Sequence, residues 1–514
     1  MKTFDRITYQ NKTILLILFF FFLRCVLSFI LELGNDEAYY WTYSKSLKFN
    51  YFDHPPMVAF FIRFFSANLV LQQYEGFIRL GSVVGCALST WFMFKATATI
   101  HSEKAGWLSA CMYSTSFYAA IMAGLHTMPD APQMVFWTFS LWMLAKITTG
   151  NQKWITWIFF GLGAGLCIMS KIHGVFLWFG LATFTLLQKR SWLARPQFYV
   201  ALVTSLLLTS PILIWNIQNN FATYLFHSSR VTINAFILNP YAFFEELLGQ
   251  FFFNNPFHVI IIIVALISIK NDKQLQKESL SLFNYIALPL ALVLLFIALF
   301  RDTLPHWNGP AYITLLPLVG VYLSDKKYTS LYRRLFQSGL IGFISFCIGW
   351  PVVNNFFPGT FGNKTGLELG KGDVTLDKYG WRIAGKKFST FYLSEIAKSK
   401  IPKGTPVVSY KWWGAHIEYY FCRPLKIEMI GLGGKNTLHE YFWTNKEKIG
   451  QVNMTTAYCI IPSDEYYNAK VRYAEYYNNI DSVTTIKVMR NNLPAHNFYV
   501  YQLNGWKGKI PVIQ

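Results

Sequence analysis

Two short stretches near the N-terminus combine acids with groups that could move a proton. "NDEAYYW" carries Asp36 and Glu37 side by side, and "YFDHPP" carries Asp53 next to His54. Adjacent carboxylates at a low-dielectric boundary repel each other, so one of them could have a raised pKa and act as a general base. The plainer alternative is that Asp36 and Glu37 face water or cap a helix, but the surrounding aromatic residues and the second acidic motif favour a function.

Asp53 and His54 are residue types that ligate a metal or contact a phosphate, although two ligands are only half of a metal site. A simple turn with a surface histidine is an equally good interpretation. The proline pair after His54 interrupts any helix, so residues 49–65 are predicted to form short helices in the membrane interface. Such helices could seat a lipid chain beside the acids.

Two later motifs place further ionisable groups beside apolar runs. "HTMPDAPQ" holds His126 and Asp130, and Asp130 could be either a helix N-terminal acid or a site residue near Asp36. "SKIHG" holds Lys171 and His173 between two closely spaced apolar runs. Lys171 could extend to water along its apolar stem, or it could neutralise a phosphate as a compact point charge.

A third motif, "RDTLPHWNGPAY", groups Arg301, His306 and Trp307 in one connection. Arg301 could pair with a phosphate. Trp307 could stack on a sugar ring or sit among interfacial aromatic residues, and the second interpretation does not explain the neighbouring Arg, Asp and His. Together with Asp53 and His54, His306 could also complete a divalent metal site.

The elements that must position these residues are membrane spans. Of the 514 residues, 53% are hydrophobic and 14% are charged, and the mean hydropathy is +0.29, which is typical of a polytopic protein embedded in a lipid bilayer. The net charge of +20 is scattered between apolar runs. It therefore favours positive cytoplasmic loops over nucleic-acid binding, and no nucleic-acid partner is expected.

About eleven apolar segments are long enough, or nearly so, to cross the hydrocarbon. The first is too long for a signal peptide and has no small-residue cleavage site, so it is kept as a span that follows Lys2, Arg6 and Lys12. The segments are 14–33, 77–99, 105–125, 131–148, 154–169, 172–188, 198–216, 248–269, 282–300, 309–323 and 335–352.

Strict alternation of the spans separates two kinds of connection. With the N-terminus inside, alternation assigns the connections 101–104, 148–153, 188–196, 270–278 and 324–334 to the cytoplasm. Together with Lys2, Arg6 and Lys12, they hold most of the Lys and Arg of residues 1–351. All the motifs described above, and the segment 218–246, fall on the opposite face. The acids and histidines are thus expected together on the outer side of the membrane.

Hydrophobic runs stop after Pro351, and residues 352–514 are predicted to form a soluble outer α/β domain. "TPVVSY" and "AYCIIP" resemble strands, and "KKFSTFYLSEIAKSK" resembles a helix. Cys422 and Cys459 could pair or remain buried thiols, and the aromatic stretch 411–425 with His416 could contact an acceptor or form core. No P-loop, GxSxG or dinucleotide motif is present.

The ordered set of "NDEAYYW", "YFDHPP", "TMPDAP" and "PHWNGPAY" resembles membrane glycosyltransferases of the dolichyl-phosphate-mannose protein mannosyltransferase type, which include bacterial aminoarabinose transferases that modify lipid A. The likeness covers essentially the whole membrane part. It implies an all-α polytopic domain with the C-type glycosyltransferase fold over 1–351, a catalytic first outer loop at 34–76, and the α/β domain at 352–514, on the periplasmic side of a bacterial inner membrane.

The resemblance also implies an activity. Family members transfer a sugar from a polyprenyl-phosphate donor, here to a lipid, glycan or protein acceptor, and the acid of the first outer loop is needed. Asp36 becomes the leading catalytic residue, with Glu37 completing the acidic pair. The aminoarabinose branch has Glu-Lys where this chain has Asp53 and His54, so neither aminoarabinose nor a lysine–phosphate contact at position 54 carries over.

The chemistry of such a transfer assigns roles to the remaining residues. The phosphate is already a good leaving group, so an inverting displacement needs a base for the acceptor hydroxyl and positive charge near the phosphate. Asp36 is the expected base. The expected substrate-binding residues are Asp53, His54, Asp130, Lys171, Arg301, His306 and Trp307, with Lys171, His54 and Arg301 facing the phosphate.

Two other classes of protein were weighed against this one. A transporter with an outer acidic solute site would need ionisable groups near the bilayer midplane, whereas the charges here lie at the ends of spans. An anchored binding protein would not need about eleven spans with acid-rich outer loops.

Overall fold

The computed structural model describes residues 7–233, 236–324 and 330–509. Lys2, Arg6 and part of the predicted cytoplasmic connection 324–334 lie outside these ranges. The chain divides into two compact units. Unit 1 comprises Met1–Ser28 and Leu47–Cys347, and unit 2 comprises Phe29–Ser46 and Ile348–Gln514. The predicted first outer loop, 34–76, is therefore shared between the units, with its acidic pair in unit 2 and "YFDHPP" in unit 1.

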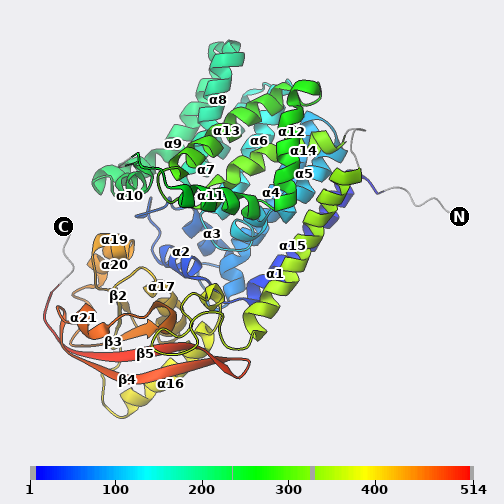
Figure 1. Ribbon diagram of the computed structural model, residues 1–514. Helices are drawn as coiled ribbons and strands as arrows, with labels where there is room; N and C mark the ends of the chain where they lie inside the picture. The colour runs from blue at the N-terminus through cyan, green and yellow to red at the C-terminus, as the bar shows by residue number, and fades with distance from the viewer. Residues whose placement is uncertain (1–6, 234–235, 325–329, 510–514) are drawn as a thin grey trace. The chain divides into compact units, whose positions relative to one another are not determined.

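Unit 1 is helical, and its helices pack side by side (Figure 1). The most extensive helix–helix contacts are those of α4 with α5 and α6, of α6 with α7, and of α7 with α9. Two of its helices, α1 (Tyr9–Ile30) and α15 (Ser330–Phe356), continue into unit 2 at their C-terminal ends. Its other elements are α3 (Met57–Phe65), α4 (Glu75–Ile100), α5 (Glu103–Thr115), η1 (Tyr118–Met122), α6 (Asp130–Thr148), α7 (Trp154–Ile168), η2 (Ile172–Gly174), α8 (Val175–Gln188), η3 (Arg190–Ala194), α9 (Pro196–Gln218), α10 (Ala222–Val231), α11 (Pro240–Phe253), α12 (Pro256–Ser268), η4 (Ile269–Asn271), α13 (Glu278–Ala298), η5 (Pro305–Asn308) and α14 (Gly309–Ser324).

Within the described residues, five helices are long and apolar enough to cross a membrane: α1, α4, α9, α13 and α15. A sixth span results if the bent pair of α11 and α12 counts as one. One short helix, at 57–65, lies in the region 49–65 where short helices were predicted, and a second short helix at 35–45 precedes that region. The predicted total of about eleven spans stays a prediction, because several of those segments form shorter helices.

The predicted span 248–269 is wrong as a single helix, because the chain bends by 99° between α11 and α12. Pro256 has no backbone N–H and disfavours the helical conformation of the residue before it, and Asn255 accordingly has φ +68°. The Asn255 amide donates to the carbonyls of Thr115 and Gly339 at 3.0 and 3.1 Å. These bonds fix the break within the surrounding helices.

The first span contains a buried arginine. Arg24 donates from Nε to the carbonyl of Ala120 and from Nη2 to the carbonyl of Ser114, each at 3.0 Å. These carbonyls lie where α5 gives way to the wider turn of η1, which interrupts the predicted span 105–125. A charged side chain inside an apolar helix thus contacts backbone acceptors instead of lipid.

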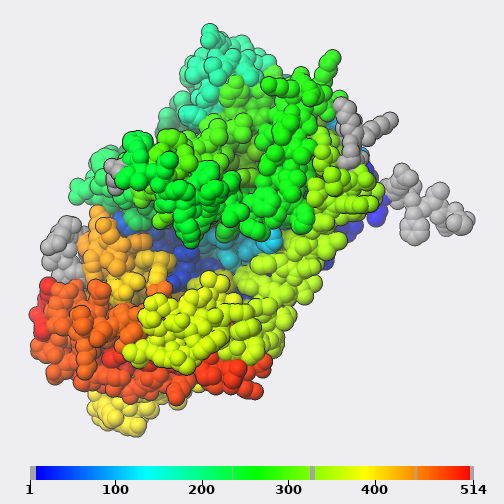
Figure 2. All heavy atoms as spheres, in the orientation of Figure 1, coloured from blue at the N-terminus to red at the C-terminus, as the bar shows by residue number. Residues whose placement is uncertain are grey.

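The outer surface of unit 1 is apolar. Helices α11 and α12 lie on the face of unit 1 turned toward the viewer in Figure 2, and they expose half or more of Phe244, Leu248, Phe252, Ile263 and Ile267. Patches of this kind are unfavourable in water but match the hydrocarbon of a bilayer. With the long apolar helices, this surface identifies an integral membrane protein.

Unit 2 contains a five-stranded sheet of order β2-β1-β3-β5-β4, shown in orange to red in Figure 1. β1 pairs in parallel with β2 and β3, whereas β5 pairs antiparallel with β3 and β4. The strands are β1 (Val407–Ser409), β2 (Met429–Gly431), β3 (Thr456–Pro462), β4 (Tyr477–Arg490) and β5 (Leu493–Trp506). The predicted strands "TPVVSY" and "AYCIIP" contain β1 and nearly all of β3.

The helices of unit 2 include the predicted one, which α16 (Trp381–Ala397) largely covers. The others are α2 (Asn35–Lys45), η6 (Val374–Lys378), α17 (Gly414–Ile417), η7 (Glu418–Cys422), α18 (Arg423–Leu425), α19 (Lys435–Leu438), α20 (Tyr441–Lys448), η8 (Ser463–Glu465) and α21 (Ala469–Tyr473). The long β4–β5 hairpin turns at Asn491 and Asn492, whose φ angles of +47° and +65° suit a two-residue hairpin turn.

A fully buried ion pair ties the hairpin to the preceding loop. The Arg490 guanidinium lies 2.8 Å from the Asp373 carboxylate and also donates to the carbonyls of Asn354 and Gly359. Cys422 and Cys459, whose pairing the sequence leaves open, are both buried free thiols. Burial raises the pKa of Cys459 to about 11, so it behaves as a small apolar side chain.

Candidate active site

In unit 2, the acidic pair lies in the first turn of α2, and its two carboxylates have different surroundings. Asp36 is exposed, whereas Glu37 is 1% exposed. The Glu37 Oε2 atom accepts from the Gly34 N–H at 2.9 Å and from Lys378 Nζ at 2.6 Å. Consecutive helical residues do not face each other, so the two carboxylates diverge. Glu37 therefore holds the start of α2, whereas Asp36 is exposed.

Gly34 precedes this helix for a steric reason. A Cβ atom at this position would lie 2.5 Å from both the Asp377 carboxylate and the Lys378 ammonium. The same Asp377 accepts from the Asn35 N–H at 2.9 Å. The carboxylate of Glu32 accepts from the backbone N–H of Trp381 at 2.8 Å. The segment that carries Asp36 is thus anchored to η6 and to the start of α16.

The other end of α2 is anchored by an ion pair between Lys45 and Glu418. Lys448 lies 3.8 Å from the same carboxylate, and Tyr441 donates to it. Burial alone would raise the pKa of Glu418, but the two ammonium groups outweigh it and lower that pKa to about 2. Glu418 is therefore ionised at neutral pH and fixes the last turn of α2.

In unit 1, Asp130 and Lys171 form a buried ion pair. Lys171 Nζ lies 2.9 and 2.8 Å from the two carboxylate oxygens, and the side chains of Lys171 and Asp130 are 5% and 2% exposed. The Tyr118 hydroxyl donates to Asp130 Oδ1 at 2.9 Å. Lys171 therefore does not extend to water, and Asp130 is more than an acid at a helix start. The structure brings these two predicted residues together from 41 positions apart.

Histidines from separate segments lie around this ion pair. His54 and His306 both lie within electrostatic range of Lys171 and Asp130. The rings of His54 and His227 are 5.6 Å apart, and His227 Nε2 lies 2.6 Å from the Asp53 carbonyl oxygen. The Asp53 main chain is thus held by a histidine of α10.

The protonation of these histidines limits their roles. Burial lowers the pKa of His54 to about 3 and the pKa of His306 to about 4. Both imidazoles are therefore neutral at neutral pH and supply hydrogen bonds but no positive charge. The role of His54 as a cation for the phosphate is not supported by this environment.

Arg301 and Trp307, which the sequence places in one motif, contact different groups. Arg301 donates to the carbonyls of Ser229 and Thr232 at 2.8 and 2.6 Å, at the C-terminal end of α10. It therefore acts as a helix cap in this structure. Trp307 packs against the Arg230 guanidinium, 5.0 Å from the ring centre, and lies 6.2 Å from the ring of His173.

In the part of the chain that the structure describes, no three His, Cys, Asp or Glu side chains are grouped so that they could hold a metal ion. The predicted metal site of Asp53, His54 and His306 is therefore wrong, because these three side chains do not form such a group.

Sequence reasoning missed His227, Arg230 and Tyr118. Both α10 residues lie in segment 218–246, which was assigned to the outer face without a motif. His227 and Arg230 are three positions apart, which places both side chains on one face of a helix, and this spacing could have marked them as candidate site residues. Tyr118 lies in η1, and nothing in its apolar surroundings indicates a polar partner.

Part of the chain is similar in sequence to known proteins. Residues 53–215 match the family described as dolichyl-phosphate-mannose-protein mannosyltransferase. A lipid A galacturonosyltransferase, RgtD, of Rhizobium johnstonii is 23% identical over 299 residues, which are 57% of this chain and 61% of that protein. The sequence match thus spans less than two thirds of that relative.

Solved structures extend the likeness to the whole fold. The structure of ArnT from Cupriavidus metallidurans bound to undecaprenyl phosphate matches with a TM-score of 0.63 and 13% identity, over 96% of this chain and 97% of that one. The structure of the same protein in the apo state matches with a TM-score of 0.62, over 96% and 98%. The predicted C-type fold is confirmed at this level, and none of these comparisons supports a transporter. Residues 53–215 thus match the model of the dolichyl-phosphate-mannose-protein mannosyltransferases, and the chain as a whole shares the fold of ArnT.

Proposed function

We propose that this protein transfers a sugar, with inversion, from a polyprenyl-phosphate donor to a hydroxyl or phosphate of a lipid, glycan or protein acceptor. The observation that carries the proposal is the match over nearly the whole chain to the fold of ArnT, whose structure contains undecaprenyl phosphate. The sequence match to a lipid A galacturonosyltransferase favours a cell-envelope lipid or glycan as acceptor.

The chemistry requires a base, and Asp36 is the proposed one. Its carboxylate is exposed at the start of an anchored helix, so an acceptor hydroxyl can approach it without displacing a structural contact of Glu37. Asp36 accepts the proton of that hydroxyl while the oxygen forms a bond to the anomeric carbon. The bond from that carbon to the phosphate oxygen breaks, and the lipid phosphate leaves with the electron pair.

The leaving phosphate requires positive charge. Lys171 and Arg230 are the proposed cations, because the buried His54 and His306 are neutral at neutral pH. Asp130 neutralises Lys171 in this structure, so a phosphate would compete with Asp130 for the ammonium. Trp307 holds the Arg230 guanidinium by its ring and restricts its orientation.

The proposed location is the inner membrane of a bacterium, with the acidic pair and unit 2 on the periplasmic side. The distribution of Lys and Arg among the connections supports this orientation. A reporter fused after residue 509 and tested for periplasmic or cytoplasmic activity would check it.

The catalytic assignment is tested by Asp36→Asn in purified full-length protein with a polyprenyl-phosphate sugar. Loss of a positioned base reduces the transfer rate by about 10²–10⁴-fold. Asp481→Asn is the matched control, because Asp481 is an exposed acid on β4. An Asp36→Asn protein that transfers at the parent rate would show that the base is another group.

A further inference from the structure

A pocket of about 280 Å³ lies within unit 2. Its walls come from the residues that follow β1 and β3, from η6 and η8, and from the first residue of α2. β1 and β3 are adjacent parallel strands although β2 lies between them in the chain. In open sheets with parallel strands, ligands bind outside the carboxyl ends of strands at the point where the strand order reverses. The pocket occupies this position.

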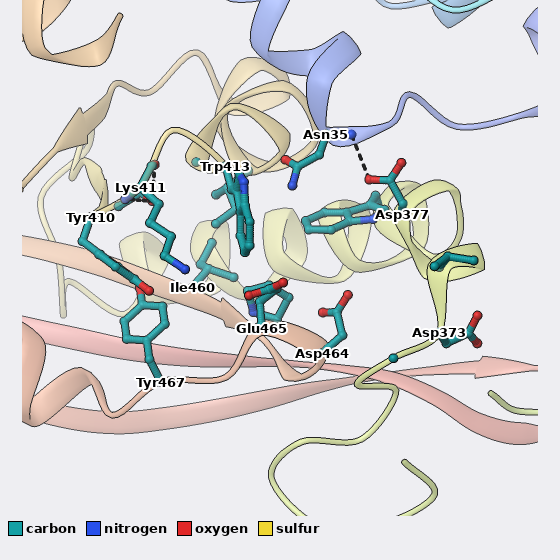
Figure 3. A pocket seen from close by; sticks show the side chains of 17 residues that line it. Asn35, Asp373, Asp377, Tyr410, Lys411, Trp413, Ile460, Asp464, Glu465 and Tyr467 are labelled. Atoms are coloured by element: carbon teal, nitrogen blue, oxygen red, sulfur yellow. Dashed lines mark hydrogen bonds between the residues drawn. The ribbon is translucent and has the colours of Figure 1, made fainter. Parts of the chain in front are cut away.

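One wall of the pocket is aromatic. Trp413 is half-buried, and Lys411 Nζ lies 4.3 Å from the centre of its ring. Figure 3 shows Lys411 on one side of Trp413, and Asn35, Asp377 and Asp464 on the other. The pairing with Lys411 covers one face of the indole, so the opposite face is turned toward these polar groups. An apolar ring face beside hydrogen-bonding groups suits a ligand that is itself apolar on one side and polar at its edge.

The polar groups of the pocket are mainly acceptors. Asn35 Oδ1 is buried and has no hydrogen-bond partner. Asp464 lies 2.7 Å from the fully buried His496, which fixes its carboxylate, and Glu465 is exposed beside it. Asp377 already accepts from the Asn35 N–H. The pocket therefore offers oxygens to a ligand that carries several donors.

The charge of the lining selects among such ligands. Four carboxylates, those of Asp373, Asp377, Asp464 and Glu465, line the pocket with Lys411 as the accompanying cation. Arg490 neutralises Asp373. The carboxylates of Asp377, Asp464 and Glu465 remain and outnumber Lys411, so the lining carries negative charge. This charge repels phosphates and uronates and attracts hydroxyl and ammonium groups.

We propose that this pocket binds one sugar unit that carries hydroxyl or amino groups and no negative charge, with its ring against Trp413 and its donors on Asn35, Asp464 and Glu465. The assignment of this sugar to the acceptor rests on the proposed function. The pocket volume is close to the lower end of about 300–1,000 Å³ for small-molecule sites, which suits a single ring.

The proposal is tested by ligand-observed NMR titration of the full-length protein in detergent with methyl glucoside, glucosamine and glucuronate. The first two are expected to bind, and glucuronate is expected to bind at least about tenfold more weakly. Trp413→Ala and Glu465→Gln should each weaken binding about tenfold. Glu465→Gln conserves shape at an exposed position, so it remains informative if Trp413→Ala unfolds.

Two matched controls keep the chemistry of the substitutions constant. Glu475→Gln removes an exposed carboxylate paired with Lys509, and Trp443→Ala removes a ring that contacts Phe442 and Lys435. Neither lines the pocket, so both should bind as the parent does. Binding of no sugar, preferential binding of glucuronate, or equal binding by Glu465→Gln and the parent would each overturn the proposal.

Transfer assays on the same preparations separate this inference from the proposed function. If sugar transfer is measured while no sugar binds the pocket, the inference fails and the proposed function stands. If sugars bind as expected but no polyprenyl-phosphate sugar is turned over, the pocket stands and the proposed function fails.

Discussion

Glu37 and Asp36 are adjacent acids, and the structure predicts opposite consequences of neutralising them. In Glu37→Gln, the amide oxygen can still accept from the Gly34 N–H, but the charged partner of Lys378 at 2.6 Å is lost. We therefore expect a loss of stability with little direct effect on the chemical step. Asp36→Asn should do the reverse, because Asp36 is exposed.

The expected loss follows from the surroundings of Lys378. Removing one partner of a fully buried ion pair costs about 3–5 kcal/mol, and a hydrogen bond to a charged group contributes about 1.5–3 kcal/mol. The Lys378 side chain is 10% exposed and has a second carboxylate, Asp377, at 4.0 Å. Because Asp377 and water still partly stabilise the Lys378 ammonium, we expect the free energy of unfolding to fall by about 2–3 kcal/mol. For a unit of this size, that lowers the melting temperature by roughly 4–12 °C.

The assay is thermal unfolding of the full-length protein in detergent, followed by tryptophan fluorescence, with sugar transfer measured well below the melting temperature. The double variant Glu37→Gln/Lys378→Met removes both partners and should recover most of the lost stability. A Glu37→Gln protein that melts like the parent yet loses transfer as Asp36→Asn does would refute the reasoning. Glu37 would then act in the chemistry and not as an anchor.

Three further predictions concern buried charges. Lys171→Met removes the cation that pairs with the Asp130 carboxylate and should destabilise unit 1 by about 3–5 kcal/mol. The double variant Lys171→Met/Asp130→Asn should restore the melting temperature, and failure to do so would show that the lost ion pair is not the cause of the destabilisation. Asp373→Asn should cost unit 2 a similar amount because Arg490 then keeps a buried charge, and an unchanged urea midpoint would contradict this. The lowered pKa of Glu418 contributes stability that is complete above about pH 4.5 and is lost as pH falls toward about 2, so Glu418→Gln should flatten the melting temperature between pH 5 and pH 3.

The sequence predicts those parts of the fold that follow from local pattern. Hydrophobic runs and β-type stretches locate α1, α4, β1 and β3, and the scattered acids and histidines mark the outer connections. The break between α11 and α12 was missed because their apolar pattern continues across it. Only the tertiary contacts of Asn255 show that the helix ends there.

The candidate site was predictable in its residue types but not in its pairings. Asp130 and Lys171 lie 41 positions apart, and Glu37 and Lys378 lie 341 apart, so no periodicity links the partners. Arg301 was predicted to contact a phosphate. Its observed partners, the carbonyls of Ser229 and Thr232 at the end of α10, are also distant in the chain, so the sequence did not indicate them. A charged residue whose partner is distant in the chain can be recognised as ionisable from its sequence, but its role depends on the fold.

The composition of unit 2 has a consequence for the order of events during synthesis. Its residues Phe29–Ser46 leave the ribosome about 300 residues before Ile348 does. At about 5–20 residues per second, the segment that bears Asp36 waits roughly 15–60 s for Ile348, and longer for Lys378 and Glu418. The proposed catalytic carboxylate thus acquires its fixed position only near the end of translation, so a truncated chain would carry the residue but not its geometry.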